Sequence, residues 1–129
     1  EGDLVAKFGI KICELETSKV YLFKEQSHPG RCIVAHKKHV GDMNELTAEE
    51  RAAYFEDVAR VARAIMKAFN PDKVNYGAYG DTGHHLHFHL CPKYKDEYEW
   101  GGVFLMNPDK KYLTDEEYAA MIEKIKANL

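Results

Sequence analysis

Apolar and polar residues alternate along two short segments near the start of the chain, and a period of two is typical of strands that bury one face. The apolar positions of these segments are Ile10, Ile12, Val20 and Leu22. The pattern predicts strands near Phe8–Leu15 and Ser18–Phe23. The turn residues Ser27-His28-Pro29-Gly30 separate them from an apolar run, Arg31–His36, which predicts a deeply buried third strand. A fourth strand is predicted over Lys73–Tyr79.

The pattern changes to a helical period after Leu46. Thr47 and Glu50 have the spacing of a capping box, and Asn70-Pro71 ends the helix that begins there. One core stripe is predicted on it, formed by Phe55, Val58, Ala62, Ile65 and Phe69. Its solvated face is predicted to carry Arg51, Glu56, Arg60, Arg63 and Lys67. A C-terminal helix is predicted at about 114–128, capped by Thr114, with Tyr118, Ile122 and Ile125 facing inward.

A last strand is predicted over Gly83–Pro92, where histidine alternates with apolar residues. Successive strand side chains point to opposite faces, so the histidines share one face and the apolar side chains share the other. The first set is His85, His87 and His89, and the second is Leu86, Phe88 and Leu90. The separation of strands and helices along the chain predicts a single α+β domain, residues 1–129, with a mostly antiparallel sheet of about five strands.

Three histidines on one face can serve a metal ion or an elongated anion. A strand rises about 3.3 Å per residue, so His85 and His89 lie about 13 Å apart, too far to share one zinc ion without a strong bend. Two adjacent members could still bind a metal. A row suits a chain of phosphates better, because one histidine can act as nucleophile while its neighbours handle protons and charge.

Composition narrows the possible partners. The chain has 129 residues and a formal net charge of −3, which argues against an extended nucleic-acid surface but not against a site for one small nucleotide. Cys13, Cys32 and Cys91 are odd in number and form no Cys-x-x-Cys pair, so we expect a reducing, cytoplasmic setting and read Cys32 as a core filler. We expect no signal peptide and no membrane-spanning segment.

The run His85-Leu86-His87-Phe88-His89-Leu90-Cys91 resembles the signature of the histidine triad superfamily. The upstream run from Pro29 to Val40 resembles that superfamily's strand with a lysine-rich turn and histidine, and Asn75 and Pro92-Lys93 stand at matching places. The resemblance extends from about Phe8 to Gly102. It implies the histidine triad fold, a homodimer, and nucleotidyl transfer to water from a nucleoside phosphoramidate or dinucleoside polyphosphate. A purine nucleotide is the expected substrate.

The resemblance also implies residue roles. His87 is the expected nucleophile, and a carbonyl accepting from its Nδ1–H would leave Nε2 free to attack the α-phosphorus. His89 and His39 are expected to bind the non-bridging oxygens, and His85 to orient its neighbours. No metal and no organic cofactor is required. His36 stands where relatives often carry proline, and we interpret it as structural.

Further positions are expected to contact the substrate. Asn75 and Thr82 match amide and hydroxyl positions that bind the phosphate or leaving group, and the glycines of the turn that ends at Gly83 let backbone N–H groups approach an anion. Trp100 is a weaker candidate, since a tail aromatic in some relatives reaches the partner subunit's site. His28 is interpreted as a solvated loop residue.

Three positions depart from the pattern of relatives. Arg31 replaces a common histidine, Glu25 is the nearest candidate for the ribose-binding acid, and Asp81 replaces a side-chain amide. Asp81 has two interpretations: a turn residue whose charge faces solvent, or a carboxylate that favours a cationic leaving group. A metal-dependent enzyme using two triad histidines and a non-catalytic nucleotide-binding protein remain as alternatives to the hydrolase.

Overall fold

The computed structural model describes residues 7–81 and 84–129. In these ranges the chain forms β1 (Gly9–Glu14), β2 (Ser18–Phe23), β3 (Cys32–His36), the short 3-10 helix η1 (Met43–Glu45), α2 (Ala48–Phe69), β4 (Lys73–Gly77), β5 (His87–Lys93) and α3 (Asp115–Lys126). The α+β class and the antiparallel sheet are confirmed. No helix in the described part of the chain has the length and apolarity needed to cross a membrane.

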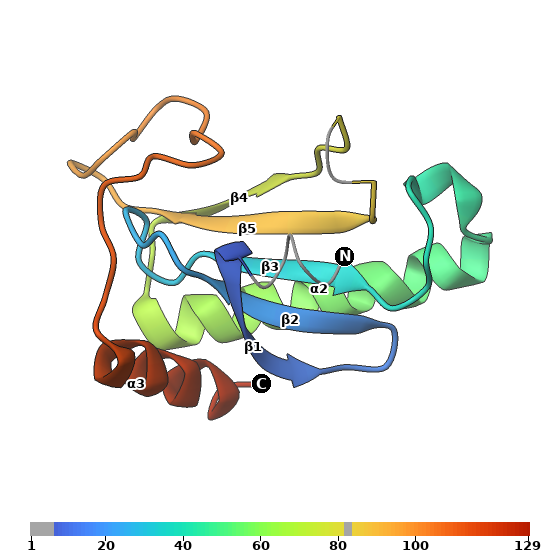
Figure 1. Cartoon of the computed structure of the whole chain (residues 1–129), viewed down its shortest axis with the longest axis horizontal. Coiled ribbons are helices and arrows are strands. Elements are labelled where there is room, and N and C mark those ends of the chain that lie inside the picture. Colours follow the sequence, from blue (N-terminus) through green and yellow to red (C-terminus); the bar gives the residue numbers. More distant parts are fainter. Residues whose placement is uncertain (1–6, 82–83) are drawn as a thin grey trace.

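Across the described residues, the sheet has five strands in the order β1-β2-β3-β5-β4, and all four pairings are antiparallel. The non-consecutive neighbours β3 and β5 lie at its centre, so the histidine strand has a neighbour on each side. Figure 1 shows α2 running behind the sheet, with α3 beside it near β1. The helices therefore leave the opposite face of the sheet to the histidines.

The long helix begins as predicted and turns a slightly different side to the core. Thr47 and Glu50 form the capping box, and Asn70 adopts the left-handed conformation at the other end. Phe55, predicted to lie in the core, is 39% exposed, whereas Tyr54 is fully buried and its hydroxyl donates to the carbonyl oxygen of Val34 at 2.7 Å. This bond to β3 fixes the rotation of α2, and the prediction for Phe55 was wrong because periodicity alone does not distinguish adjacent aromatic residues.

The core lies between α2 and the sheet. Val34, Cys32 and Leu90 are fully buried there, and the interpretation of Cys32 as a core filler is confirmed. Burial raises the pKa of the Cys32 thiol well above its usual value, which keeps it protonated.

The chain between β5 and α3 crosses one end of the sheet, as the orange loop of Figure 1 shows. It is tied down by the Tyr94 hydroxyl, which donates to the carbonyl of Pro29 at 2.6 Å, and by Gln26 N–H, which donates to the carbonyl of Lys111 at 2.8 Å. These bonds bring Phe104 against the histidine face. The capping box of α3 at Thr114 is confirmed, and Tyr118 and Ile125 are buried as predicted.

Candidate active site

The register of the central strands places the histidines on the face of the sheet away from α2. Ala35 and Ile33 of β3 lie opposite His87 and His89, and on the other side Gly77 of β4 lies opposite His89. A Cβ at Gly77 would lie 2.6 Å from the Tyr79 ring and 2.9 Å from the Phe104 ring, so a larger residue here would force these rings to shift. The alternation predicted for residues 86–90 is confirmed, since Leu86 and Leu90 join the core on the α2 side.

His85 is not part of the strand, and the prediction that β5 begins near Gly83 was wrong. Leu86 accepts from the N–H of His36 at 3.0 Å but donates its own N–H to the carbonyl of Val40 at 2.9 Å. Because Val40 lies beyond the end of β3, this second bond diverts the chain from the regular ladder. The buried His85 ring donates from Nε2 to the carbonyl of His36, and its centroid lies 5.5 Å from that of His39.

His87 has a defined tautomer. Its Nδ1 lies 2.8 Å from the carbonyl oxygen of His85, and a carbonyl can only accept, so the proton is on Nδ1. The lone pair is therefore on Nε2, on a half-buried ring. A neutral imidazole nitrogen with an available lone pair is a nucleophile or a base.

His89 has the opposite tautomer. Nη2 of Arg31 lies 3.0 Å from its Nδ1, and a guanidinium only donates, so Nδ1 accepts and Nε2 carries the proton. Burial, with additional effects from Arg31 and His87, lowers the pKa of His89 to about 3. The rings of His87 and His89 are edge to face with centroids 5.2 Å apart. Adjacent rings thus present a lone pair on one and an N–H donor on the other.

The turn after β3 places His39 next to the triad. Lys37, Lys38 and His39 are exposed, and the contact with His85 brings His39 close to the histidine row. His36 is structural as interpreted: its Nδ1 accepts from the N–H of Lys38 at 2.9 Å, and its ring packs edge-on against Tyr54.

The other site candidates are not all brought together. Asn75 lies on the histidine side of β4, opposite Cys91, and its Oδ1 accepts from Nζ of Lys93 at 3.4 Å. Asp81 and Trp100 are exposed. Thr82 and Gly83 lie outside the described residues.

The Glu25 side chain has a structural role within the protein. Its carboxylate accepts from the N–H and hydroxyl of Ser27 and from the N–H groups of Lys110 and Lys111, at 2.6–3.0 Å. Burial by itself would raise the pKa of Glu25, but these hydrogen bonds outweigh it and the pKa lies below its usual value. All four donors come from the chain itself, so the proposed bond to a ribose stays a prediction that the contacts do not support.

Two buried groups near the site were missed. His28, predicted to be solvated, is 1% exposed and donates from Nε2 to Glu99 at 2.7 Å. Lys93 is 2% exposed and donates to the carbonyl of Gly102 at 2.7 Å. Both partners belong to the loop after β5, and no local pattern in the sequence indicates such a distant pairing.

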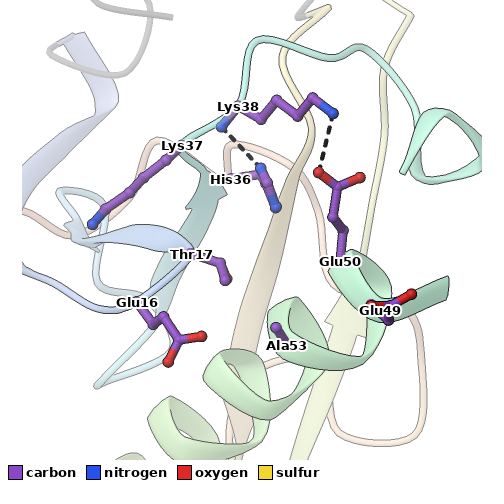
Figure 2. Close-up of a pocket in the computed structure, with 8 residues that line it drawn as sticks. All are labelled: Glu16, Thr17, His36, Lys37, Lys38, Glu49, Glu50 and Ala53. Carbon is purple, nitrogen blue, oxygen red and sulfur yellow. Dashed lines mark hydrogen bonds and ion pairs between the residues drawn. The ribbon is translucent and has the colours of Figure 1, made fainter. Parts of the chain in front are cut away.

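A separate pocket lies on the other side of β3, between the start of α2 and the turns after β1 and β3 (Figure 2). It is lined by Glu16, Thr17, His36, Lys37, Lys38, Glu49, Glu50 and Ala53. Lys38 pairs with Glu50 at 3.0 Å across it. The triad histidines do not line this pocket, so we place the candidate chemistry on the histidine face.

Among the described residues, no group of three or more His, Cys, Asp or Glu side chains is placed to hold a metal ion. Nδ1 of His87 and Nδ1 of His89 are both engaged within the protein.

Comparison with known proteins places this geometry in a family. The HIT domain matches residues 9–96. The chain is 28% identical over 127 residues to the adenosine 5'-monophosphoramidase hnt1 of Schizosaccharomyces pombe, covering 93% of this chain and 88% of that protein. It is also 28% identical over 76 residues to the bis(5'-adenosyl)-triphosphatase of Dictyostelium discoideum, covering 55% of this chain and 51% of that protein.

A solved structure shares the fold over the whole chain. A histidine triad protein from Sinorhizobium meliloti superimposes with a TM-score of 0.93, at 23% identity, over 100% of this chain and 96% of that one. With the match to the HIT domain over more than half of the sequence, the chain belongs to the histidine triad family.

Proposed function

We propose that the protein is a nucleotide hydrolase that attacks the α-phosphate of a nucleoside phosphoramidate or a dinucleoside polyphosphate through His87. The observation that carries this proposal is the 2.8 Å contact from Nδ1 of His87 to the carbonyl of His85, which leaves the Nε2 lone pair free on the open side of the ring. The names of the S. pombe and D. discoideum relatives support these two substrate classes and an adenine nucleotide.

The reaction would proceed in two displacements. Nε2 of His87 forms a bond to phosphorus while the bond to the leaving group breaks, and an amine leaving group takes up a proton as it departs. Water then attacks the nucleotidyl-histidine, the N–P bond breaks, and the water's proton is lost as the nucleoside monophosphate forms. Two easier steps replace one difficult step.

The neighbours would stabilise the charge on phosphorus. Nε2–H of His89 is aimed from the ring next to the nucleophile and would donate to a non-bridging oxygen. His39 would bind a second oxygen from the exposed turn. His85 would act as a positioning residue, since its backbone carbonyl fixes the tautomer of His87.

We further propose that the protein is a homodimer. β4 is an edge strand of the sheet in the described part of the chain, and Tyr76 on it is 53% exposed, so this edge and its aromatic side chain are available to a second copy. Trp100 is 42% exposed and would then be free to approach the partner's site. Light scattering at micromolar concentration should give twice the monomer mass; a monomer mass would contradict this part of the proposal.

The covalent intermediate is the decisive test of the reaction. Rapid acid-free quenching after mixing with adenosine 5'-phosphoramidate labelled at phosphorus should trap up to one label per chain, stable to base and lost in acid. The His87→Asn variant should bind the nucleotide without labelling. Nucleotide binding with neither label nor turnover in the parent protein would instead favour a non-catalytic nucleotide-binding protein.

Treatment with a strong chelator separates the metal-dependent alternative. Nδ1 of His87 and Nδ1 of His89 are engaged within the protein and Nε2 of His89 carries a proton, so these two rings offer a metal only Nε2 of His87. Activity and labelling should therefore persist, apart from any effect of magnesium on the substrate itself. If the chelator abolished both activity and labelling, and zinc or manganese restored them, the proposed mechanism would be contradicted.

A further inference from the structure

Arg31 is a fully buried guanidinium directly behind the histidine row. It lies between two aromatic rings, with its Cζ 4.0 Å from the centroid of Phe23 and 4.8 Å from that of Phe104. Nη1 donates to the carbonyl of Leu105 at 3.0 Å, and Nη2 donates to the carbonyl of Met106 at 2.8 Å. Nη2 also contacts Sδ of Met106 at 3.7 Å and Nδ1 of His89 at 3.0 Å.

The charge of Arg31 is not neutralised by a contact. Among the described residues no carboxylate lies within ion-pair distance of it, and its Nε has no hydrogen-bond partner. Burial lowers the pKa of Arg31, but an arginine stays charged in proteins. An unpaired buried charge is costly to keep, and a leucine or methionine would fill the same space without that cost.

The contact with His89 determines what that ring can do. An isolated neutral imidazole can adopt either of two tautomers. A hydrogen bond at one of its nitrogens selects between them. A guanidinium cannot accept, so it selects the tautomer with the proton on Nε2. The cation also opposes protonation of Nδ1, which would place two like charges in contact.

The described residues around His89 include no carboxylate among its ring contacts or the charges that shift its pKa. In the described ranges, the charged or titratable groups that act on it are Arg31, which directly precedes β3, and His87 from β5, and its ring also contacts Phe23 and Phe104. The ring is therefore held neutral by its surroundings across the physiological pH range.

We propose that Arg31 is a positioning residue of the phosphate site, which holds His89 as a neutral Nε2–H donor and places a permanent positive charge behind that donor, toward the substrate's phosphate oxygens. The proposal rests on the proposed function, since it assigns the donor of that reaction. It also gives the segment around Phe104–Met106 a role, because the two carbonyls and the ring hold the guanidinium in place.

Three substitutions separate the donor from the charge. Arg31→Gln keeps an N–H donor for Nδ1 without the charge, Arg31→Lys keeps the charge with another donor geometry, and Arg31→Met removes both at similar volume. Arg51 supplies a matched control: it is a half-buried arginine that donates to the carbonyl of Leu46, and Arg51→Met removes the same groups at the start of α2.

The tautomer is read by nitrogen-15 NMR of the imidazoles, with the His89 signals assigned by their absence from His89→Gln. In the parent and in Arg51→Met, His89 should keep one neutral Nε2–H form from pH 5 to 8. In Arg31→Met it should become a mixture of tautomers or titrate in that range, and Arg31→Gln should restore the single form. Unchanged His89 signals in all three Arg31 variants would overturn the proposal.

Steady-state kinetics test whether Arg31 contributes to turnover. Loss of one preorganised donor typically lowers kcat by about 10²–10³-fold. The kcat of Arg31→Met should therefore be at least about tenfold below that of the parent, with KM much less affected. Arg31→Gln should recover part of this loss, and the pH profile of kcat in Arg31→Met should gain an ionisation on its acid side. If Arg31→Met does not fold, the His89 signals and kcat of Arg31→Gln and Arg31→Lys are compared with those of the parent instead.

The outcomes are distinguishable. Arg31 variants that alter the His89 tautomer but keep kcat within twofold of the parent would overturn the functional role. An equal loss of kcat in Arg51→Met would show that any lost arginine has this effect, which also overturns it. A parent protein without activity on either nucleotide class would refute the proposed function, while the NMR measurement would still read the Arg31–His89 contact by itself.

Discussion

The two faces of β5 use the same strand for different purposes. On the side of α2, Leu90 is fully buried and Phe88 packs against the core, so what matters there is volume and apolar area. On the other side, the functions of His87 and His89 depend on which ring nitrogen carries the proton. One face can exchange similar side chains at a moderate cost, whereas the other depends on the direction of single hydrogen bonds. Stability and turnover should therefore respond to different substitutions.

The largest effect should follow from His87→Asn. The variant keeps a polar side chain of similar reach but has no imidazole nucleophile, so turnover should fall by about 10³-fold or more, with little change in nucleotide affinity. Steady-state kinetics and nucleotide titration measure both quantities.

The matched control for this substitution is His84→Asn, which changes an exposed histidine next to the same strand. It should keep the parent's turnover. An active His87→Asn would remove His87 from the mechanism, and a comparable loss in His84→Asn would point to the loop rather than the nucleophile.

Leu90→Ala tests the apolar face. Removing most of a fully buried leucine should lower the free energy of unfolding by about 2–5 kcal/mol, measured by urea denaturation. Leu90→Met, which conserves volume, should cost less than about 1.5 kcal/mol. Both variants should retain the parent's kcat per folded molecule; a selective loss of kcat in Leu90→Met would show that the two faces are coupled.

Acid should weaken the fold through the buried histidines. Burial lowers the pKa of His28, His36 and His89 in the folded protein, so the unfolded chain binds more protons below its own histidine pKa of about 6.5. Stability is then fully present above that pH and falls as the pH drops toward the folded-state values. Each histidine contributes up to about 1.4 kcal/mol per pH unit.

Urea midpoints between pH 7 and 5 measure this slope, and the range lies above the titration of Glu25. His89→Gln should reduce the slope by up to one proton, whereas Leu90→Met should leave it unchanged. A slope that is identical in His89→Gln and the parent would contradict the assignment of a neutral His89.

The smallest effect is expected at Asp81. Its carboxylate is exposed, and exposed charges interact by less than about 1 kcal/mol. Asp81→Asn should therefore change kcat/KM for an adenosine phosphoramidate and for a diadenosine polyphosphate by the same factor, below about fivefold. Opposite changes for the two substrates would show that Asp81 reads the leaving group.

Local signals in the chain were sufficient for the elements and for the histidine row. The capping boxes at Thr47 and Thr114 and the alternation from Leu86 to Leu90 depend on residues within a few positions of one another, and all were confirmed. Errors arose where a distant contact competes with a local pattern. Tyr54 rather than Phe55 faces the core because of its bond to Val34, and His85 leaves the strand because Leu86 bonds to Val40.

The sequence by itself determined that three histidines lie along an apolar strand segment, because side-chain alternation is a property of extended backbone. Only the tertiary structure decided what each ring does. Arg31 contacts His89, 58 positions away in the sequence, because the strand register places Ile33 opposite His89. His28 contacts Glu99, 71 positions away, because the loop after β5 folds over the end of the sheet. Protonation and tautomer follow from such contacts, and no period or composition of the chain contains them.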